Sequence, residues 1–157
     1  MRWTGGELFM YAEISKNAEL FLKAIEDVWV AEQIQLGSTN NAVWHCTQAV
    51  EKVMKGFLRC QNMDYDYGHQ LRLLLEVVEA VFELSAEAKK NIVYLDDFGI
   101  GLRYKNLSDD PSLGDTKVAI ARTKSIIDEF RRHPTASTFI NEAEEVHKKI
   151  LKASKTE

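Results

Sequence analysis

Apolar residues recur every three to four positions along most of this chain, the spacing that places them on one face of a helix. The first such segment covers about residues 7–36. Its apolar positions are Ala18, Phe21, Leu22, Ile25, Val28 and Trp29. Gly37 is a typical helix stop, and residues 38–41 offer caps for a second helix that we expect to end near Gln61.

Four further helices are predicted after a turn at residues 64–68. Their apolar positions are Leu71, Leu74, Leu75, Val78, Val81 and Phe82; Ile92, Leu95, Phe98 and Leu102; Val118, Ala121, Ile127 and Phe130; and Phe139, Ala143, Val146, Ile150 and Ala153. Ser85 is a candidate cap for the second of these four helices. We expect residues 105–114 to form a loop and Pro134 to block the preceding helix, so the last helix should cover about residues 138–154.

The whole pattern predicts an all-α fold, an antiparallel up-and-down bundle of five to six helices, because no segment alternates as a strand would. The 157 residues suit one domain spanning residues 1–157. A net charge of −4 without a long basic run does not favour nonspecific nucleic-acid binding. We expect a cytoplasmic protein, because no apolar run reaches the ~18 residues of a membrane span, residues 1–6 lack the apolar core of a signal peptide, and the two cysteines suit reduced thiols.

Metal and cofactor chemistry has little support in the sequence. Cys46 and Cys60 would lie about 21 Å apart on one helix, too far for a disulfide, which favours reduced thiols. His133 and His147 are fourteen residues apart, and no zinc-ligand spacing or phosphate-binding glycine motif occurs. We therefore predict neither a metal nor a cofactor.

A polar stripe accompanies the apolar face of the second helix. His45, Gln48 and Lys52 lie three and four residues apart, so their side chains share one face. Lys52 and His45 could bind a phosphate or a partner's carboxylate, with Gln48 supplying an amide. The alternative, which we favour, is that Glu51 and Lys55 form an ordinary surface ion pair and the remaining polar residues edge the core.

The same stretch resembles the HEPN domain (higher eukaryotes and prokaryotes nucleotide-binding). The matching block comprises His45, Gln48, Ala49, Glu51, Lys52, Gly56, Phe57 and Leu58, followed by His69 and Leu71. A later match is Leu102-Arg103-Tyr104, although Lys105 replaces the proline that the family often carries there. The resemblance covers about residues 7–133 and implies the same helical bundle.

The resemblance also bears on catalysis. Nuclease members of the family carry an arginine and, four to six residues later, a histidine that can activate a ribose hydroxyl. Arg103 fits the arginine, but Ser108, Asp109 and Asp110 occupy the histidine positions. Asp96, Asp97, Asp109 and Asp110 could instead bind a divalent metal, although a solvated loop with a helix cap is the simpler interpretation.

The predicted binding residues are His45, Gln48, Lys52, His69, Arg103 and Tyr104. For His69 we favour a structural role, docking the turn onto the second helix, over that of a general base. Gln48 and Arg103 could alternatively tie the second and fourth helices together.

Three hypotheses follow. The first is a noncatalytic HEPN-type module that forms a homodimer and pairs with a small nucleotidyltransferase, in a toxin-antitoxin-like or stress-response system, with nucleotide binding as the family's traditional label. The second is a ribonuclease using Arg103 with a nonstandard partner such as Asp109 or His69; RNA is open as a ligand but not favoured. The third is a helical bundle of unrelated function.

Overall fold

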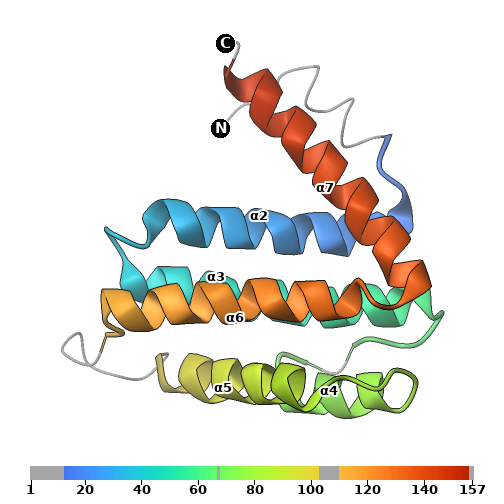
Figure 1. The fold of residues 1–157 in the computed structure, drawn as a ribbon, viewed down its shortest axis with the longest axis horizontal. Helices are drawn as coiled ribbons and strands as arrows, with labels where there is room; N and C mark the ends of the chain where they lie inside the picture. The colour runs from blue at the N-terminus through green and yellow to red at the C-terminus, as the bar shows by residue number, and fades with distance from the viewer. Residues whose placement is uncertain (1–12, 67, 103–109, 156–157) are drawn as a thin grey trace.

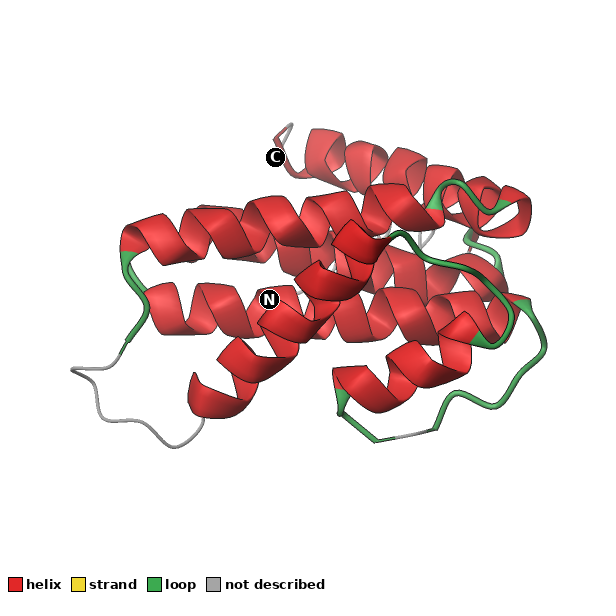
Figure 2. Cartoon of the chain, turned by 60° about the horizontal axis from the view of Figure 1, so that its bottom comes forward, coloured by secondary structure: helices red, strands yellow, loops and turns green. Residues whose placement is uncertain are grey.

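The computed structural model describes residues 13–66, 68–102 and 110–155, with only the backbone considered for residues 99–102. Within these ranges the regular structure is helical and contains no strand (Figure 2). After a short 3₁₀ turn, Lys16–Ala18, come α2 (Glu19–Ile34), α3 (Thr39–Cys60), α4 (Leu71–Glu79), α5 (Ala86–Leu102), α6 (Leu113–Phe130) and α7 (Pro134–Lys155). The predicted all-α bundle of five to six helices is therefore confirmed.

The helices α2, α3, α5 and α6 alternate in direction, and α7 runs obliquely across one end of α2 (Figure 1). Helix α3 is central, because it contacts α2, α4, α5, α6 and α7. Its close approach to α2 depends on Gly56, where an added Cβ would lie 3.2 Å from the ring of Phe21. The interior is built around the fully buried Phe57, whose ring lies 5.4 Å from those of both Phe82 and Phe130. The packing of α3 against its neighbours therefore fixes the positions of the polar residues that α3 carries.

The capping chemistry at the helix ends was predicted only in part. Ser38 occupies the position before α3, but its hydroxyl caps no backbone amide there; only its carbonyl accepts the amide hydrogen of Ala42. The Ser85 hydroxyl accepts a hydrogen bond from the Ala88 amide at 3.1 Å, as expected for a helix cap. Ser112 and Asp115 form a reciprocal capping box at the start of α6.

The first predicted helix is interrupted. Ser15 has extended backbone geometry (φ −65°, ψ 149°), so α2 begins only at Glu19. The physical reason is a tertiary contact: the Ser15 amide and hydroxyl donate to the Glu142 carboxylate of α7, at 2.8 and 2.6 Å. The part of this prediction covering residues 7–12 lies outside the described residues.

The last helix begins earlier than predicted. Pro134 does not separate two helices by a long turn but is itself the first residue of α7. Proline is well suited to this position, because its missing N–H would have no helical acceptor there. The helix therefore starts at Pro134 rather than near residue 138.

The predicted apolar face of α6 was partly wrong. Val118 and Ala121 are exposed. The buried face instead consists of Thr116, Ala119, Ile120, Thr123, Ile126, Ile127 and Phe130. Thr116 and Thr123 are polar, so the sequence did not mark this face as apolar. They can be buried because their hydroxyls donate to the carbonyls of Ser112 and Ala119 one turn earlier.

Candidate functional site

The polar stripe of α3 converges on a carboxylate from α2. His45 Nδ1 lies 2.8 Å from Asp27 Oδ1, and Lys52 Nζ lies 2.5 Å from Asp27 Oδ2. The Asp27 side chain is only 11% exposed, whereas those of His45 and Lys52 are 23% and 27% exposed. One buried carboxylate thus holds two partly exposed groups at the α2–α3 boundary.

This geometry sets the chemistry available to each group. A carboxylate only accepts hydrogen bonds, so the Nδ1–H of His45 donates to Asp27, which directs the imidazole's second nitrogen away from the carboxylate. The Lys52 charge is balanced by Asp27, so an incoming phosphate would have to compete with that carboxylate. The Trp44 ring, 41% exposed, lies edge-on to His45 with 5.0 Å between ring centroids. Asp27, His45 and Lys52 are called the α2–α3 triad below.

Gln48 lies on the same stripe and is half-buried. Its side-chain amide makes no hydrogen bond to the part of the chain that the structure describes. Arg103 and Tyr104, which we expected to complete the site, lie outside the described residues. Their proximity to the α2–α3 triad, and the proposed tie between Gln48 and Arg103, therefore stay predictions.

Glu51, the residue before Lys52 on α3, contacts a second group of polar side chains. Its two oxygens lie 3.0 Å from His69 Nδ1 and 3.5 Å from Lys55 Nζ. The docking role favoured for His69 is confirmed, because this contact ties the turn before α4 to α3. The expected pair between Glu51 and Lys55 forms, but its surface location was wrong, because the two side chains are only 7% and 15% exposed.

The carboxylates considered for metal binding are engaged by Arg72. The guanidinium lies 2.8 Å from Asp96 and 2.7 Å from Asp97, and hydrogen bonding to Asp97 is the main cause that raises the pKa of Arg72 above its usual value. Asp96 also accepts the Leu71 amide at 3.2 Å, which satisfies the first turn of α4. Across the described ranges, no group of three or more acidic, histidine or cysteine side chains is arranged to hold a metal. The predicted contribution of Asp109 lies outside those ranges.

The two cysteines are free thiols, as the spacing predicted. Burial raises the pKa of both Cys46 and Cys60 to about 11, so neither is a reactive thiolate near neutral pH. Among the described helices, none combines the length and apolar character needed to cross a bilayer.

Sequence reasoning missed Asp27 and Arg72, the residues that organise two of these groups. Asp27 had a usable signal: it follows Ala24 by three residues and precedes Ala31 by four, so it lies on the buried stripe of α2. A carboxylate at such a position needs a hydrogen-bonded cation. Its partner could have been sought among the polar residues of α3.

Comparison with protein families finds a match to the HEPN domain over residues 12–153. Comparisons with curated proteins and with solved structures found no match. The family match covers nearly the whole chain and includes all the residues of the α2–α3 triad and of the Glu51 group. This chain therefore belongs to the HEPN domain family.

Proposed function

We propose that this protein is a noncatalytic HEPN binding module that forms a homodimer and pairs with a small nucleotidyltransferase, in a toxin-antitoxin-like or stress-response system. The observation that carries the noncatalytic assignment is in the sequence: no histidine occurs between His69 and His133. The usual base that follows the family's arginine is therefore missing after Arg103.

The placement of His133, one of the two flanking histidines, supports this proposal. His69 is bound through Nδ1 to Glu51. The His133 ring packs edge-on against Phe57 and Phe82, with centroids 5.0 and 5.3 Å away. Both rings thus have structural partners. The His133 ring therefore has a structural place among the core aromatic rings. His69 is 69% exposed and oriented by a carboxylate, as a general base can be, so the RNA cleavage test below also bears on His69.

The internal pairing of charges supports protein recognition over phosphate binding. Lys52 and His45 already share Asp27, and Lys55 and His69 share Glu51. To bind here, a nucleotide phosphate would have to compete with Asp27 for Lys52 and His45, or with Glu51 for Lys55 and His69. A protein partner could instead use the exposed Trp44 ring beside His45 together with the Gln48 amide, which makes no hydrogen bond inside the described ranges.

The homodimer part of the proposal is supported by exposed apolar surface. Outside the α2–α3 triad, the apolar side chains of Leu36, Leu73, Val81 and Val118 are at least 43% exposed, and a dimer interface can cover such surface. A closed twofold dimer would bury the same patch on both copies. Sedimentation at micromolar concentration tests this, and a monomer of 17.9 kDa would contradict it.

Two experiments test the rest. Purification of the native protein should recover a nucleotidyltransferase, and Trp44→Ala or Gln48→Ala should weaken that association without lowering the melting temperature. Incubation with single-stranded and structured RNA, with and without Mg²⁺, should give no cleavage. Cleavage that disappears in Arg103→Ala would overturn the noncatalytic assignment and establish the ribonuclease alternative.

A further inference from the structure

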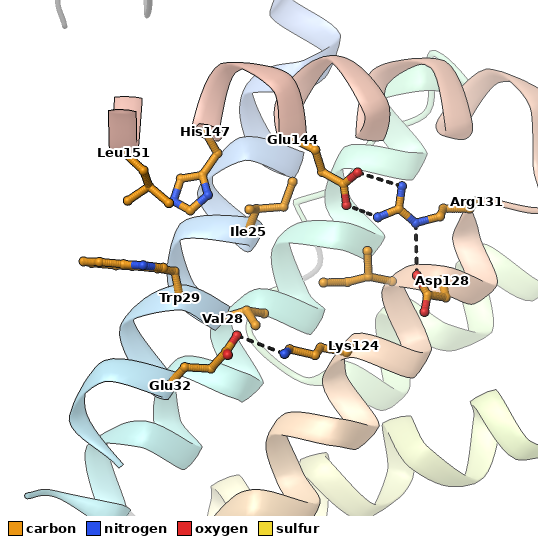
Figure 3. Close-up of a pocket in the computed structure, with 11 residues that line it drawn as sticks. Ile25, Val28, Trp29, Glu32, Lys124, Asp128, Arg131, Glu144, His147 and Leu151 are labelled. Carbon is orange, nitrogen blue, oxygen red and sulfur yellow. Dashed lines mark hydrogen bonds and ion pairs between the residues drawn. The ribbon is translucent and has the colours of Figure 1, made fainter. Parts of the chain in front are cut away.

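A pocket of about 400 Å³ lies between α2, α6 and α7, away from the α2–α3 triad (Figure 3). Its volume falls within the range of small-molecule sites in proteins. The apolar wall consists of Ile25, Val28, Trp29, Ile127 and Leu151. Figure 3 shows Trp29, His147 and Leu151 together on one side of this pocket. An apolar group of modest size can therefore lie against this wall.

Trp29 offers an aromatic surface held in place by its neighbour. Its ring is 40% exposed and contacts the His147 ring edge-on, with 6.3 Å between centroids and 72° between planes. Burial lowers the pKa of His147 below its usual range, an effect that outweighs the attraction of Glu26, so the imidazole is neutral near neutral pH. The Trp29 face is thus free to stack with a flat ring or to contact a cation.

The polar rim carries an excess of negative charge. Three carboxylates, those of Glu32, Asp128 and Glu144, face only two cations, Lys124 and Arg131. Lys124 pairs with Glu32 at 3.1 Å, while Arg131 bonds to both Asp128 and Glu144. Because Arg131 is held by two carboxylates, it is poorly available to an anionic ligand. The rim leaves one negative charge for a ligand to balance.

We propose that this pocket binds a small aromatic monocation, with the ring against Trp29 and the ammonium group toward the rim carboxylates. The proposal is independent of the nucleotidyltransferase pairing. It identifies the site as unsuited to nucleotides, whose phosphates would add negative charge to a rim that already carries an excess. The combination of an exposed tryptophan face, a neutral imidazole and surplus carboxylate favours a cation over its neutral and anionic analogues.

The test uses three probes of the same size that differ in charge: 2-phenylethylamine, 2-phenylethanol and phenylacetate. Each is titrated to about 10 mM at pH ~8 by saturation-transfer NMR, since ligands this small bind with dissociation constants of about 1 mM. The amine should bind at least about fivefold more tightly than phenylacetate, the ratio expected from one unpaired charge near the rim. Absence of amine binding, or equal affinity for the amine and the acid, would overturn the proposal.

Protein variants locate the site. Trp29→Ala should abolish amine binding, whereas Trp44→Ala, which removes an equally exposed tryptophan outside the pocket, should leave it unchanged. Asp128→Asn should weaken the amine relative to 2-phenylethanol, because it removes the surplus charge. Leu151→Trp should block the pocket by filling it, and it keeps the test decisive if Trp29→Ala unfolds. Unchanged amine affinity in Leu151→Trp, or loss in Trp44→Ala alone, would contradict this location.

Discussion

Replacing Asp27 by asparagine tests how far the α2–α3 triad holds the bundle together. The change keeps the shape of the side chain but removes the charge that pairs with both His45 and Lys52. Asparagine can still accept one hydrogen bond through its carbonyl oxygen. Its NH₂ group would then lie against either the Lys52 ammonium or the His45 Nδ1–H, and both of these groups are donors. The loss therefore combines a missing ion pair with a mismatched donor.

The magnitude follows from the burial of the three groups. Asp27 is only 11% exposed, but its partners His45 and Lys52 are 23% and 27% exposed, so water partly solvates the two donor groups left behind. The cost should lie between that of an exposed pair and that of a fully buried one, or about 2 kcal/mol of unfolding free energy. In a domain of this size, that corresponds to a fall in melting temperature of about 4–8 °C.

Urea denaturation monitored by circular dichroism provides the assay. The matched control is Glu145→Gln, which removes a carboxylate paired with Lys148 where both side chains are highly exposed, at 66% and 70%. This control should change stability by less than about 0.5 kcal/mol. A double-mutant cycle with Lys52→Met should give a coupling energy of about 1 kcal/mol. If Asp27→Asn lowers the unfolding free energy no more than the control does, the α2–α3 triad does not stabilise the packing of α2 against α3.

Three further predictions concern packing, pH and capping. Gly56→Val should cost about 1–3 kcal/mol in thermal melts, because the added carbon meets Phe21 at 3.2 Å, whereas Gly37→Val, with nothing closer than 3.9 Å, should be nearly neutral. Burial lowers the pKa of His147 in the folded protein, so the unfolded chain binds a proton at this site first as the pH falls. The stability of the wild type should therefore fall as the pH drops below about 6.5, and His147→Leu should show a shallower fall. Parallel pH curves for the two proteins would contradict this. Ser112→Ala should cost about 1 kcal/mol by removing the capping box of α6, and no loss in urea titration would show that the box is dispensable.

Most of the fold could be predicted from the sequence, because helix identity depends on local periodicity and local caps. Ser85 and Gly37 mark boundaries through chemistry that reaches only a few residues. The errors arose where distant contacts decide the outcome. Ser15 leaves the helical conformation while bonding to Glu142, 127 residues away, a contact that no local pattern encodes. Thr116 and Thr123 can be buried because their hydroxyls donate to carbonyls of their own helix. Counting threonine as polar therefore assigned these two core positions to the surface.

The candidate site was harder to predict for a related reason. The spacing of His45, Gln48 and Lys52 correctly placed them on one face, but it could not reveal that Asp27 lies opposite them. That single carboxylate changes the chemistry of the stripe, because it balances the charge of Lys52 and holds His45, which leaves Gln48 as the residue of the stripe without a hydrogen bond inside the described ranges. Electrostatic attraction of phosphate is thereby weakened, while amide and aromatic contacts to a protein are left in place. The two sites differ in charge for this reason. In the α2–α3 triad, Asp27 balances the charge of Lys52, whereas the pocket between α2, α6 and α7 has more carboxylates than cations beside the exposed ring of Trp29.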